Sequence, residues 1–254
     1  MVKVNGAAIA IYIIFSIAIL VGAIVFIRLK LKTKLKPFLV GGLTWLAFSV
    51  MLEGSLNAII LTAVPSIRAN IFIFAIFGGL MAGIFEELGR YLAFMVFLKR
   101  DIENDKNALA YAAGHGGFEA VYILLTTVLS IIVMAAMING GAGEQLGDQL
   151  PSATESIKSL TAPMALLAVV ERISAIIAHF ALTVFVWFSF KEGKPALLFV
   201  AIGVHAAFDA ASLLLANVLP VWAVEIAILI MAAAIGAAGR YVWKKHHTAE
   251  TALL

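Results

Sequence analysis

The sequence predicts an all-α membrane protein, a polytopic helix bundle with about seven transmembrane helices. The first indication is composition: of 254 residues, 63% are hydrophobic and 13% are charged, and the mean hydropathy is +1.05. These values lie far outside those of soluble globular domains. The second is length, because seven apolar segments reach the ~20 residues that cross the hydrocarbon core as a helix. We therefore expect a multi-pass integral protein of the cell membrane, in contact with the lipid bilayer.

The expected spans follow one another with short connections. They cover residues 7–28, 37–62, 70–98, 107–138, 162–190, 195–217 and 220–242. The first follows Lys3, but its apolar run is too long for a signal peptide and no A-x-A site closes it, so we expect a retained helix. The longest polar connection, 139–159, is rich in Gly and Ser. We expect a solvated loop there, with a lid or a short interfacial helix as the alternative.

The whole chain, 1–254, is expected to form a single membrane domain. Its motif-bearing core covers about 70–217, and the peripheral helices are about 7–28, 37–62 and 220–242. The sequence contains no cysteine, which excludes disulfides and thiolate chemistry.

The basic residues predict the orientation. The first connection, "RLKLKTKLK", carries five of them, and the same side receives most of the remaining Lys and Arg, whereas the opposite side has Lys3, Arg68 and Lys158. By the positive-inside rule the N-terminus is outside and the C-terminus is cytoplasmic. The formal charge of +3 is then mostly a topological signal, so we expect no nucleic-acid partner.

Ionisable residues inside the spans are the candidate functional groups, because such residues are rare in lipid and mark function. Four of them can be counted from the expected cytoplasmic ends of four different helices: Glu86, His115, His179 and His205. At about 1.5 Å per residue, all four lie roughly 12–18 Å from that edge. Structural polar residues scattered through a bundle have little reason to share one depth, so this layer predicts a site.

Spacing supports the same layer. Glu86 and Arg90, His115 and Glu119, and His205 and Asp209 are i,i+4 pairs, and each pair shares one helix face. An acid one turn from a histidine can orient its ring or join it as a metal ligand. Three histidines with carboxylates suit Zn²⁺ or a similar ion, and a spare glutamate could activate the water. The candidate metal ligands are His115, His205, His179, Glu119 and Asp209.

The motifs resemble a known family. "EELGR" at Glu86, Glu87 and Arg90, "YAAGHGGFE" around His115, and "HAAFD" from His205 resemble the YhfC group of intramembrane metallopeptidases. That group is similar to the superfamily of type II CAAX prenyl endopeptidases and bacteriocin-processing proteins, PrsW and the Aph subunit of gamma-secretase. The resemblance covers spans three to six.

The resemblance implies roles for residues in this chain. Glu86 and Glu87 match the acidic pair, one of which activates water; His115 matches the second motif; His205 and Asp209 match the last. The arginine comes one residue early, giving E-E-x-x-R in place of E-E-x-x-x-R, and Tyr111 replaces a phenylalanine. His179 and Glu119 are not part of the superfamily pattern.

These observations predict an intramembrane peptidase that hydrolyses a peptide bond within or near the membrane. Glu86, Glu87 and Arg90 are the expected catalytic residues, water is expected to enter from the cytoplasmic side, and the cofactor is Zn or the mechanism is metal-free. The substrate is expected to be a membrane protein or a lipidated peptide. The alternatives are a proton- or metal-coupled transporter and a non-catalytic scaffold.

Four further expectations concern residues outside this layer. We expect a structural ion pair between Glu53 and Arg172, and we expect Glu225 to reach water at the external interface. The tryptophans are expected mainly in interfacial belts. The residues 244–247 are expected to form a solvated tail.

Overall fold

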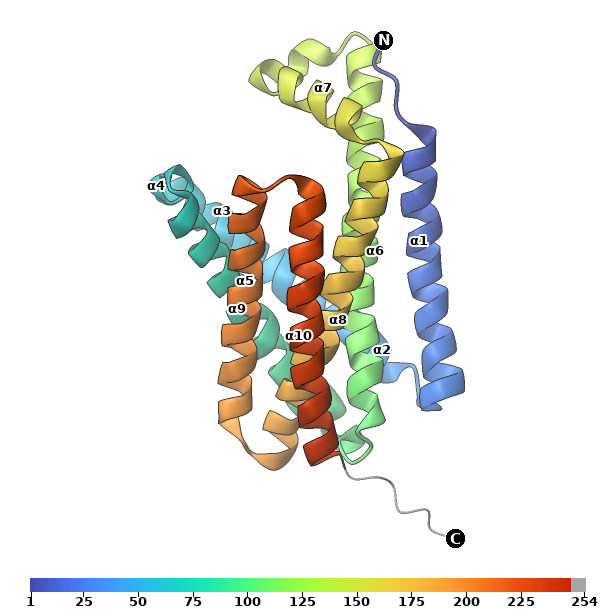
Figure 1. Ribbon diagram of the computed structural model, residues 1–254, viewed down its shortest axis with the longest axis vertical. Coiled ribbons are helices and arrows are strands. Elements are labelled where there is room, and N and C mark those ends of the chain that lie inside the picture. Colours follow the sequence, from blue (N-terminus) through green and yellow to red (C-terminus); the bar gives the residue numbers. More distant parts are fainter. Residues whose placement is uncertain (248–254) are drawn as a thin grey trace.

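The computed structural model describes residues 1–247, and within them the chain forms a bundle of helices (Figure 1). Seven helices in this part are long and apolar enough to cross a membrane. They are Gly6–Leu31, Lys36–Ala63, Ile71–Asp101, Lys106–Asn139, Ala162–Glu192, Pro195–Val218 and Val221–His246. The expected all-α membrane bundle is confirmed, and each span agrees with its expected range to within a few residues. The membrane orientation and the division into core and periphery stay predictions.

Three of the spans are composite. The first joins α1 (Gly6–Val25) to a π-helical turn, η1 (Phe26–Leu31). The second consists of α2 (Lys36–Trp45), a π-helical segment η2 (Leu46–Glu53) and α3 (Gly54–Ala63). After the short α4 (Ser66–Ala69), the third consists of α5 (Ile71–Ala93), η3 (Phe94–Leu98) and η4 (Lys99–Asp101). The others are single helices: α6 (Lys106–Asn139), α8 (Ala162–Glu192), α9 (Pro195–Val218) and α10 (Val221–His246).

Local sequence sets where the site-bearing helices begin and end. The Asn70 side chain accepts hydrogen bonds from two backbone N–H groups in the first turn of α5, and Thr161 caps α8 in the same way. Such caps satisfy N–H groups that have no partner within the helix. At the far end of α8, Gly193 has φ of 64°, a left-handed conformation that glycine adopts readily. The chain can therefore reverse at once into α9.

The segment after α6 is helical, so the expectation of a solvated loop is wrong. A 3-10 helix, η5 (Gly143–Gln149), leads into α7 (Leu150–Ser159), which lies across the end of the bundle that holds the N-terminus (Figure 1). Ala153 and Ile157 of α7 are buried. Because these residues are four apart, they form one apolar face that packs onto the bundle. The alternative expectation, a short helix at this end, describes the segment.

Small residues let the site-bearing helices approach closely. A Cβ atom on Gly83 of α5 would lie 2.6 Å from the backbone oxygen of Ile202 in α9, and one on Gly79 would lie 2.3 Å from that of Ala206. On α6, a Cβ on Gly116 would lie 3.1 Å from the Cβ of His179 in α8. Glycines at helix interfaces in membranes serve such close packing. They bring the acidic motif of α5 beside α9, and His115 beside α8.

At the opposite end of the bundle, Asp105 connects α8 and the residue that follows α10. Its Oδ1 accepts hydrogen bonds from Trp187 Nε1 at 2.9 Å and Lys191 Nζ at 2.7 Å, and its Oδ2 lies 2.9 Å from His247 Nδ1. Trp187 is therefore a core residue, 0% exposed, and not part of an interfacial belt. The expected solvated tail is also wrong at His246 and His247, which contact Glu192 and Asp105.

These contacts govern the ionisation of Asp105, which lies between two spans. Burial alone would raise the pKa of Asp105, but the hydrogen bonds from Lys191, Trp187 and His247 outweigh it and lower the pKa of the carboxyl below its usual value. The ionised carboxylate therefore stabilises the folded chain.

The close packing at Gly83 predicts a stability change. Gly83→Ala should destabilise the detergent-solubilised protein by about 1–3 kcal/mol, because the new methyl overpacks a backbone contact. Gly78→Ala is the matched control: a Cβ there meets nothing within 4 Å, so this variant should be neutral or slightly more stable. Equal thermal unfolding midpoints for the two variants would contradict the close α5–α9 crossing.

Asp105→Asn should lower stability by about 1–3 kcal/mol at neutral pH, because it removes the charge that three donors share. A lowered pKa in the fold means that the contribution is full above the unfolded value, near 3.9, and is lost as pH falls through the folded value. The wild-type advantage in unfolding midpoint should therefore persist from pH 7 to 5 and shrink below about pH 4. A difference that is the same at all these pH values would show that charge is not the cause.

Candidate metal centre

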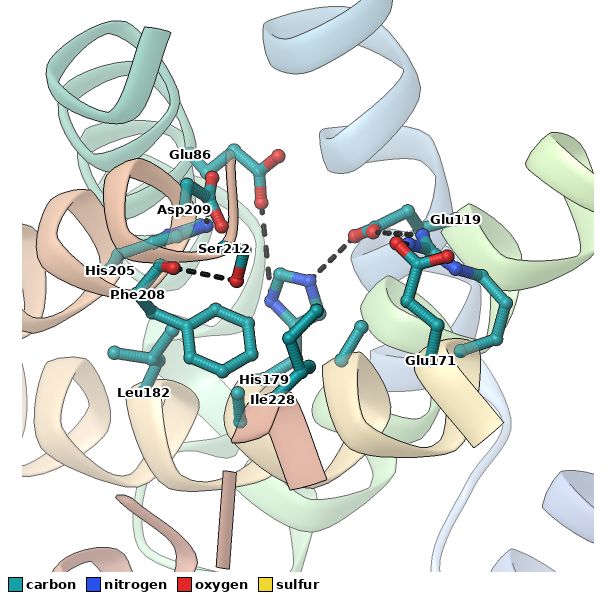
Figure 2. Close-up of a pocket in the computed structure, with 13 residues that line it drawn as sticks. Glu86, Glu119, Glu171, His179, Leu182, His205, Phe208, Asp209, Ser212 and Ile228 are labelled. Atoms are coloured by element: carbon teal, nitrogen blue, oxygen red, sulfur yellow. Dashed lines mark hydrogen bonds and ion pairs between the residues drawn. The ribbon is translucent and has the colours of Figure 1, made fainter. Parts of the chain in front are cut away.

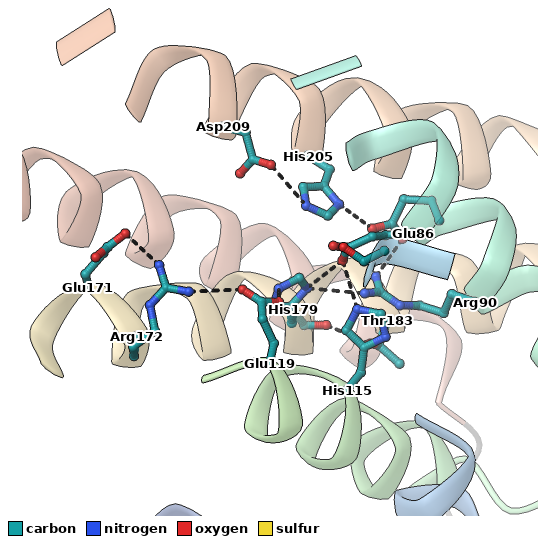
Figure 3. Close-up of polar contacts among 12 residues, drawn as sticks. Glu86, Arg90, His115, Glu119, Glu171, Arg172, His179, Thr183, His205 and Asp209 are labelled. Carbon is teal, nitrogen blue, oxygen red and sulfur yellow. Dashed lines mark hydrogen bonds and ion pairs between the residues drawn. The ribbon is translucent and has the colours of Figure 1, made fainter. Parts of the chain in front are cut away.

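Polar side chains from α5, α6, α8 and α9 meet inside the bundle (Figure 3). The rings of His115 and His179 have centroids 4.9 Å apart, and those of His179 and His205 are 5.4 Å apart. The residues counted to one depth in the sequence therefore lie side by side. The whole cluster consists of Glu86, Glu87, Arg90, His115, Glu119, Glu171, Arg172, His179, His205 and Asp209.

Both carboxylate oxygens of Glu87 have a partner. Its Oε2 accepts a hydrogen bond from Arg90 Nη1 at 2.6 Å, and its Oε1 lies 2.7 Å from His205 Nδ1. Glu87 and Arg90 are both 0% exposed. A buried arginine is tolerated in this setting only with such a partner. Glu87 thus holds Arg90 on its own helix and His205 on α9.

Glu86 differs because it keeps a free carboxylate oxygen. Its Oε2 lies 2.9 Å from His115 Nε2 and 4.0 Å from His179 Nδ1, whereas Oε1 has no partner among the described residues. Glu86 also lines a cavity, and Glu87 does not. Of the two adjacent acids, Glu86 is therefore the one that can reach water.

His179 lies between Arg90 and Glu119. Arg90 Nη2 lies 3.2 Å from His179 Nδ1, and a guanidinium can only donate, so Nδ1 accepts this bond. On the other side of the ring, His179 Nε2 lies 2.6 Å from Glu119 Oε2. The ring is therefore oriented by an arginine on one side and faces a carboxylate of the cluster on the other.

Arg172 closes the far side of the cluster. It donates from Nη1 to Glu119 at 3.2 Å and from Nη2 to Glu171 at 2.6 Å. The expected Glu53–Arg172 ion pair is therefore wrong. Glu53 instead accepts hydrogen bonds from Ser49 and Asn57 on its own span, because these residues, one turn away on either side, are nearer than α8.

Four ligand-type side chains are close enough to hold a metal ion. One atom each from Glu86, His115, Glu119 and His179 lies within 4.8 Å of the others. Zinc bonds of about 2.1 Å place tetrahedral ligands about 3.4 Å apart, so a small contraction of this set would suffice. The buried Nδ1 of His115 also has no hydrogen-bond partner within residues 1–247. Both the donor types and the spacing fit a zinc-like ion.

The structure brings only three of the five metal ligands expected from the sequence into one compact group. His115, His179 and Glu119 belong to the compact group, whereas His205 and Asp209 lie outside it. His205 contacts Glu87, and its Nε2 lies 3.6 Å from Asp209 Oδ2. The roles of all five residues, and of Glu86, Glu87 and Arg90, stay predictions at this point.

A cavity of about 110 Å³ adjoins the cluster (Figure 2). It is large enough for several water molecules. Glu86, Glu119, His179, His205 and Asp209 are among its lining residues. Ser212 and Phe208, which the sequence did not single out, also line it. Ser212 is seven residues beyond His205 on α9, and this two-turn spacing is the signal that places both on one face.

The cavity continues toward the end of the bundle that holds α7, whereas the sequence led us to expect entry of water from the side of the basic loops, which stays a prediction. A second hollow of about 420 Å³ shares Glu171, Asp209, Ser212 and Ile228 with the cavity and reaches the turn between α9 and α10. On the other side, an apolar cluster that includes Phe94, Tyr111 and Trp187 fills the space between the site and the basic loops. Large aromatic rings close that end.

Comparisons with known proteins agree with this geometry. A family model described as "YhfC intramembrane metalloprotease" matches residues 15–232. The "Uncharacterized membrane protein YhfC" of Bacillus subtilis (strain 168) is 36% identical over 203 residues, which are 76% of this chain and 78% of that protein. No solved structure matches the chain. The matched range includes every residue of the buried polar cluster. This multi-pass membrane chain therefore belongs to the YhfC family of intramembrane metalloproteases.

Proposed function

We propose that the chain hydrolyses a peptide bond within or near the membrane, in a membrane-protein or lipidated-peptide substrate. The observation that carries this proposal is Glu86. It has one carboxylate oxygen free beside a cavity, and its other oxygen lies next to the two histidines of a metal-type donor set. A carboxylate placed between water and such a set is the arrangement expected of a general base.

Three residues would hold the metal: His115, His179 and Glu119. When bound there, a zinc-like ion would supply Lewis acidity to the water and to the scissile carbonyl. Arg90 orients the His179 ring from outside this set, because its Nη2 donates a hydrogen bond to Nδ1. Arg172 holds one oxygen of Glu119 and so fixes the direction of that carboxylate.

Glu86 would carry the proton transfers. It accepts a proton from water as the water oxygen attacks the carbonyl carbon, and it returns that proton to the amide nitrogen as the C–N bond breaks. The products are a carboxylic acid and an amine, so one water molecule is consumed. Glu87 and Arg90, with their polar atoms turned to each other and to His205 and His179, would position the site without touching the substrate.

The shape of the site favours hydrolysis over transport. A proton- or metal-coupled transporter needs polar groups that form a path across the whole membrane. In the described part of the chain, the hollows lead from the site toward one end, and the cluster around Phe94 and Trp187 closes the other. A scaffold would need neither a free carboxylate nor a cavity for water.

The two adjacent glutamates should respond differently to substitution. Glu86→Gln should reduce cleavage by about 10²–10⁴-fold, because the amide cannot accept the proton from water, and it should leave the unfolding midpoint nearly unchanged. Glu87→Gln should lower stability by about 3–5 kcal/mol, because it leaves Arg90 buried without its counter-charge.

The readouts are thermal unfolding of the purified variants and mass-spectrometric counting of new N-termini in membrane proteins of cells expressing each one. Cells without the protein provide the background. If Glu86→Gln generated the same new N-termini as the wild type, hydrolysis by Glu86 would be refuted. If Glu87→Gln were as stable as the wild type, its proposed structural role would be refuted.

A further inference from the structure

The hollow that extends the cavity is lined by acidic side chains. It lies among α8, α9 and α10, and three carboxylates line it, those of Glu171, Asp209 and Glu225. Its lining includes no Lys, Arg or His. The remaining walls are mostly apolar and include Leu213, Val224 and Ile228. The hollow therefore resembles an apolar groove with a negatively charged pole formed by these three carboxylates.

Of these three carboxylates, Glu225 is the one that has no cationic partner among the described residues. Glu171 is paired with Arg172 at 2.6 Å, and Asp209 lies 3.6 Å from His205. Glu225 makes no hydrogen bond or ion pair among the described residues, although it is only 7% exposed. It lies near the start of α10 and lines two hollows at that end of the bundle, so the expectation that it reaches water at an interface stays a prediction. Its buried Oε2 has no partner.

An isolated buried carboxylate is costly unless a ligand compensates it, because removing a charge from water without a counter-charge is unfavourable. Glu225 and Glu171 also line a third hollow, which extends beneath Ser156 and Ser159 of α7. The two acids thus lie where the groove toward the site meets the space under α7. A chain entering from this end would pass them before it reached Glu86.

We propose that this groove is the substrate-entry path and that Glu225, with Glu171, binds a cationic nitrogen of the substrate segment, a lysine or arginine side chain or a free amino group. The apolar walls fit the hydrophobic residues of such a segment, and the acidic pole fits its charge. This inference rests on the proposed hydrolysis and adds a preference for substrates that are basic beside an apolar stretch. The same cation could be the headgroup amine of a lipid, which the test separates.

The absence of cysteine from the sequence allows a direct test. A Ser212→Cys thiol would lie where the cavity meets the groove, and a Ser66→Cys thiol on exposed α4 is the control. The full-length variants in nanodiscs are reacted with a cationic reagent, 2-(trimethylammonium)ethyl methanethiosulfonate, and with the anionic 2-sulfonatoethyl analogue. The measured quantity is the ratio of the cation rate to the anion rate.

The ratio at Ser212→Cys should exceed the control ratio by about tenfold or more, because acidic clefts with apolar walls concentrate cations. Adding Glu225→Gln should bring it close to the control, and Glu225→Asp, which keeps the charge, should preserve it. Equal ratios at both thiols, or a ratio that Glu225→Gln leaves unchanged in a variant that retains the wild-type unfolding midpoint, would overturn the proposal.

A protection experiment identifies the source of the cation. A synthetic leucine-alanine peptide with one terminal lysine should slow the labelling of Ser212→Cys, and the same peptide with norleucine should not. The nanodisc lipid is then changed from phosphatidylcholine to phosphatidylethanolamine. If this change slowed the labelling of Ser212→Cys and the lysine peptide did not, the cation would be a lipid headgroup and the peptide proposal would be overturned. The labelling measures binding in the groove and needs no hydrolysis. A negative labelling result would therefore overturn the groove proposal and leave the proposed hydrolysis standing, and a positive result could occur in a chain that does not cleave peptides.

Discussion

The architecture depends on the cost of placing an arginine in the middle of a membrane bundle. Arg90 is 0% exposed and donates to Glu87 and toward His179. Each of these acceptors is held by a further partner, Glu87 by His205 and His179 by Glu119. One buried cation therefore ties together α5, α6, α8 and α9. Removing any member leaves another buried polar group without a partner, which explains why the cluster forms as a unit.

Because of this network, the two adjacent acids have different surroundings. Both carboxylate oxygens of Glu87 contact Arg90 or His205, whereas Glu86 faces the cavity with one oxygen free. The ends of the bundle show a similar division. Aromatic packing and the contacts of Asp105 close one end, whereas hollows lead from the site toward α7 at the other. The hollows therefore lie on one side of the site, and packed side chains lie on the other.

Much of this arrangement could be predicted from the sequence, because span length and residue spacing follow from helix geometry. The seven spans required only apolar length, and the layer of Glu86, His115, His179 and His205 required only counting along helices. Counting gives height in the membrane but not which helices are neighbours. The Glu53–Arg172 pair was wrong for this reason, since both residues lie at compatible heights but Arg172 faces Glu119.

Other features depend on packing that no local pattern reveals. The helix α7 was mistaken for a loop because its polar residues outnumber the two buried ones, Ala153 and Ile157. The position of the hollows could not be predicted, because a charge layer does not indicate which side of it is filled by rings such as Phe94 and Trp187. That Arg172 belongs to the site had a weak signal: it precedes His179 by two helical turns and so shares its face.

The most direct test of the account is the metal content of the protein, purified in detergent without chelators or a metal-affinity tag. The account predicts near-stoichiometric zinc or a similar ion in the wild type and in His246→Ala, whose residue lies at the opposite end beside Glu192. The ion should be lost in His179→Ala, which removes one member of the compact donor set. Metal retained in folded His179→Ala, or absent from the folded wild type, would contradict a metal centre held by His115, His179 and Glu119 beside Glu86.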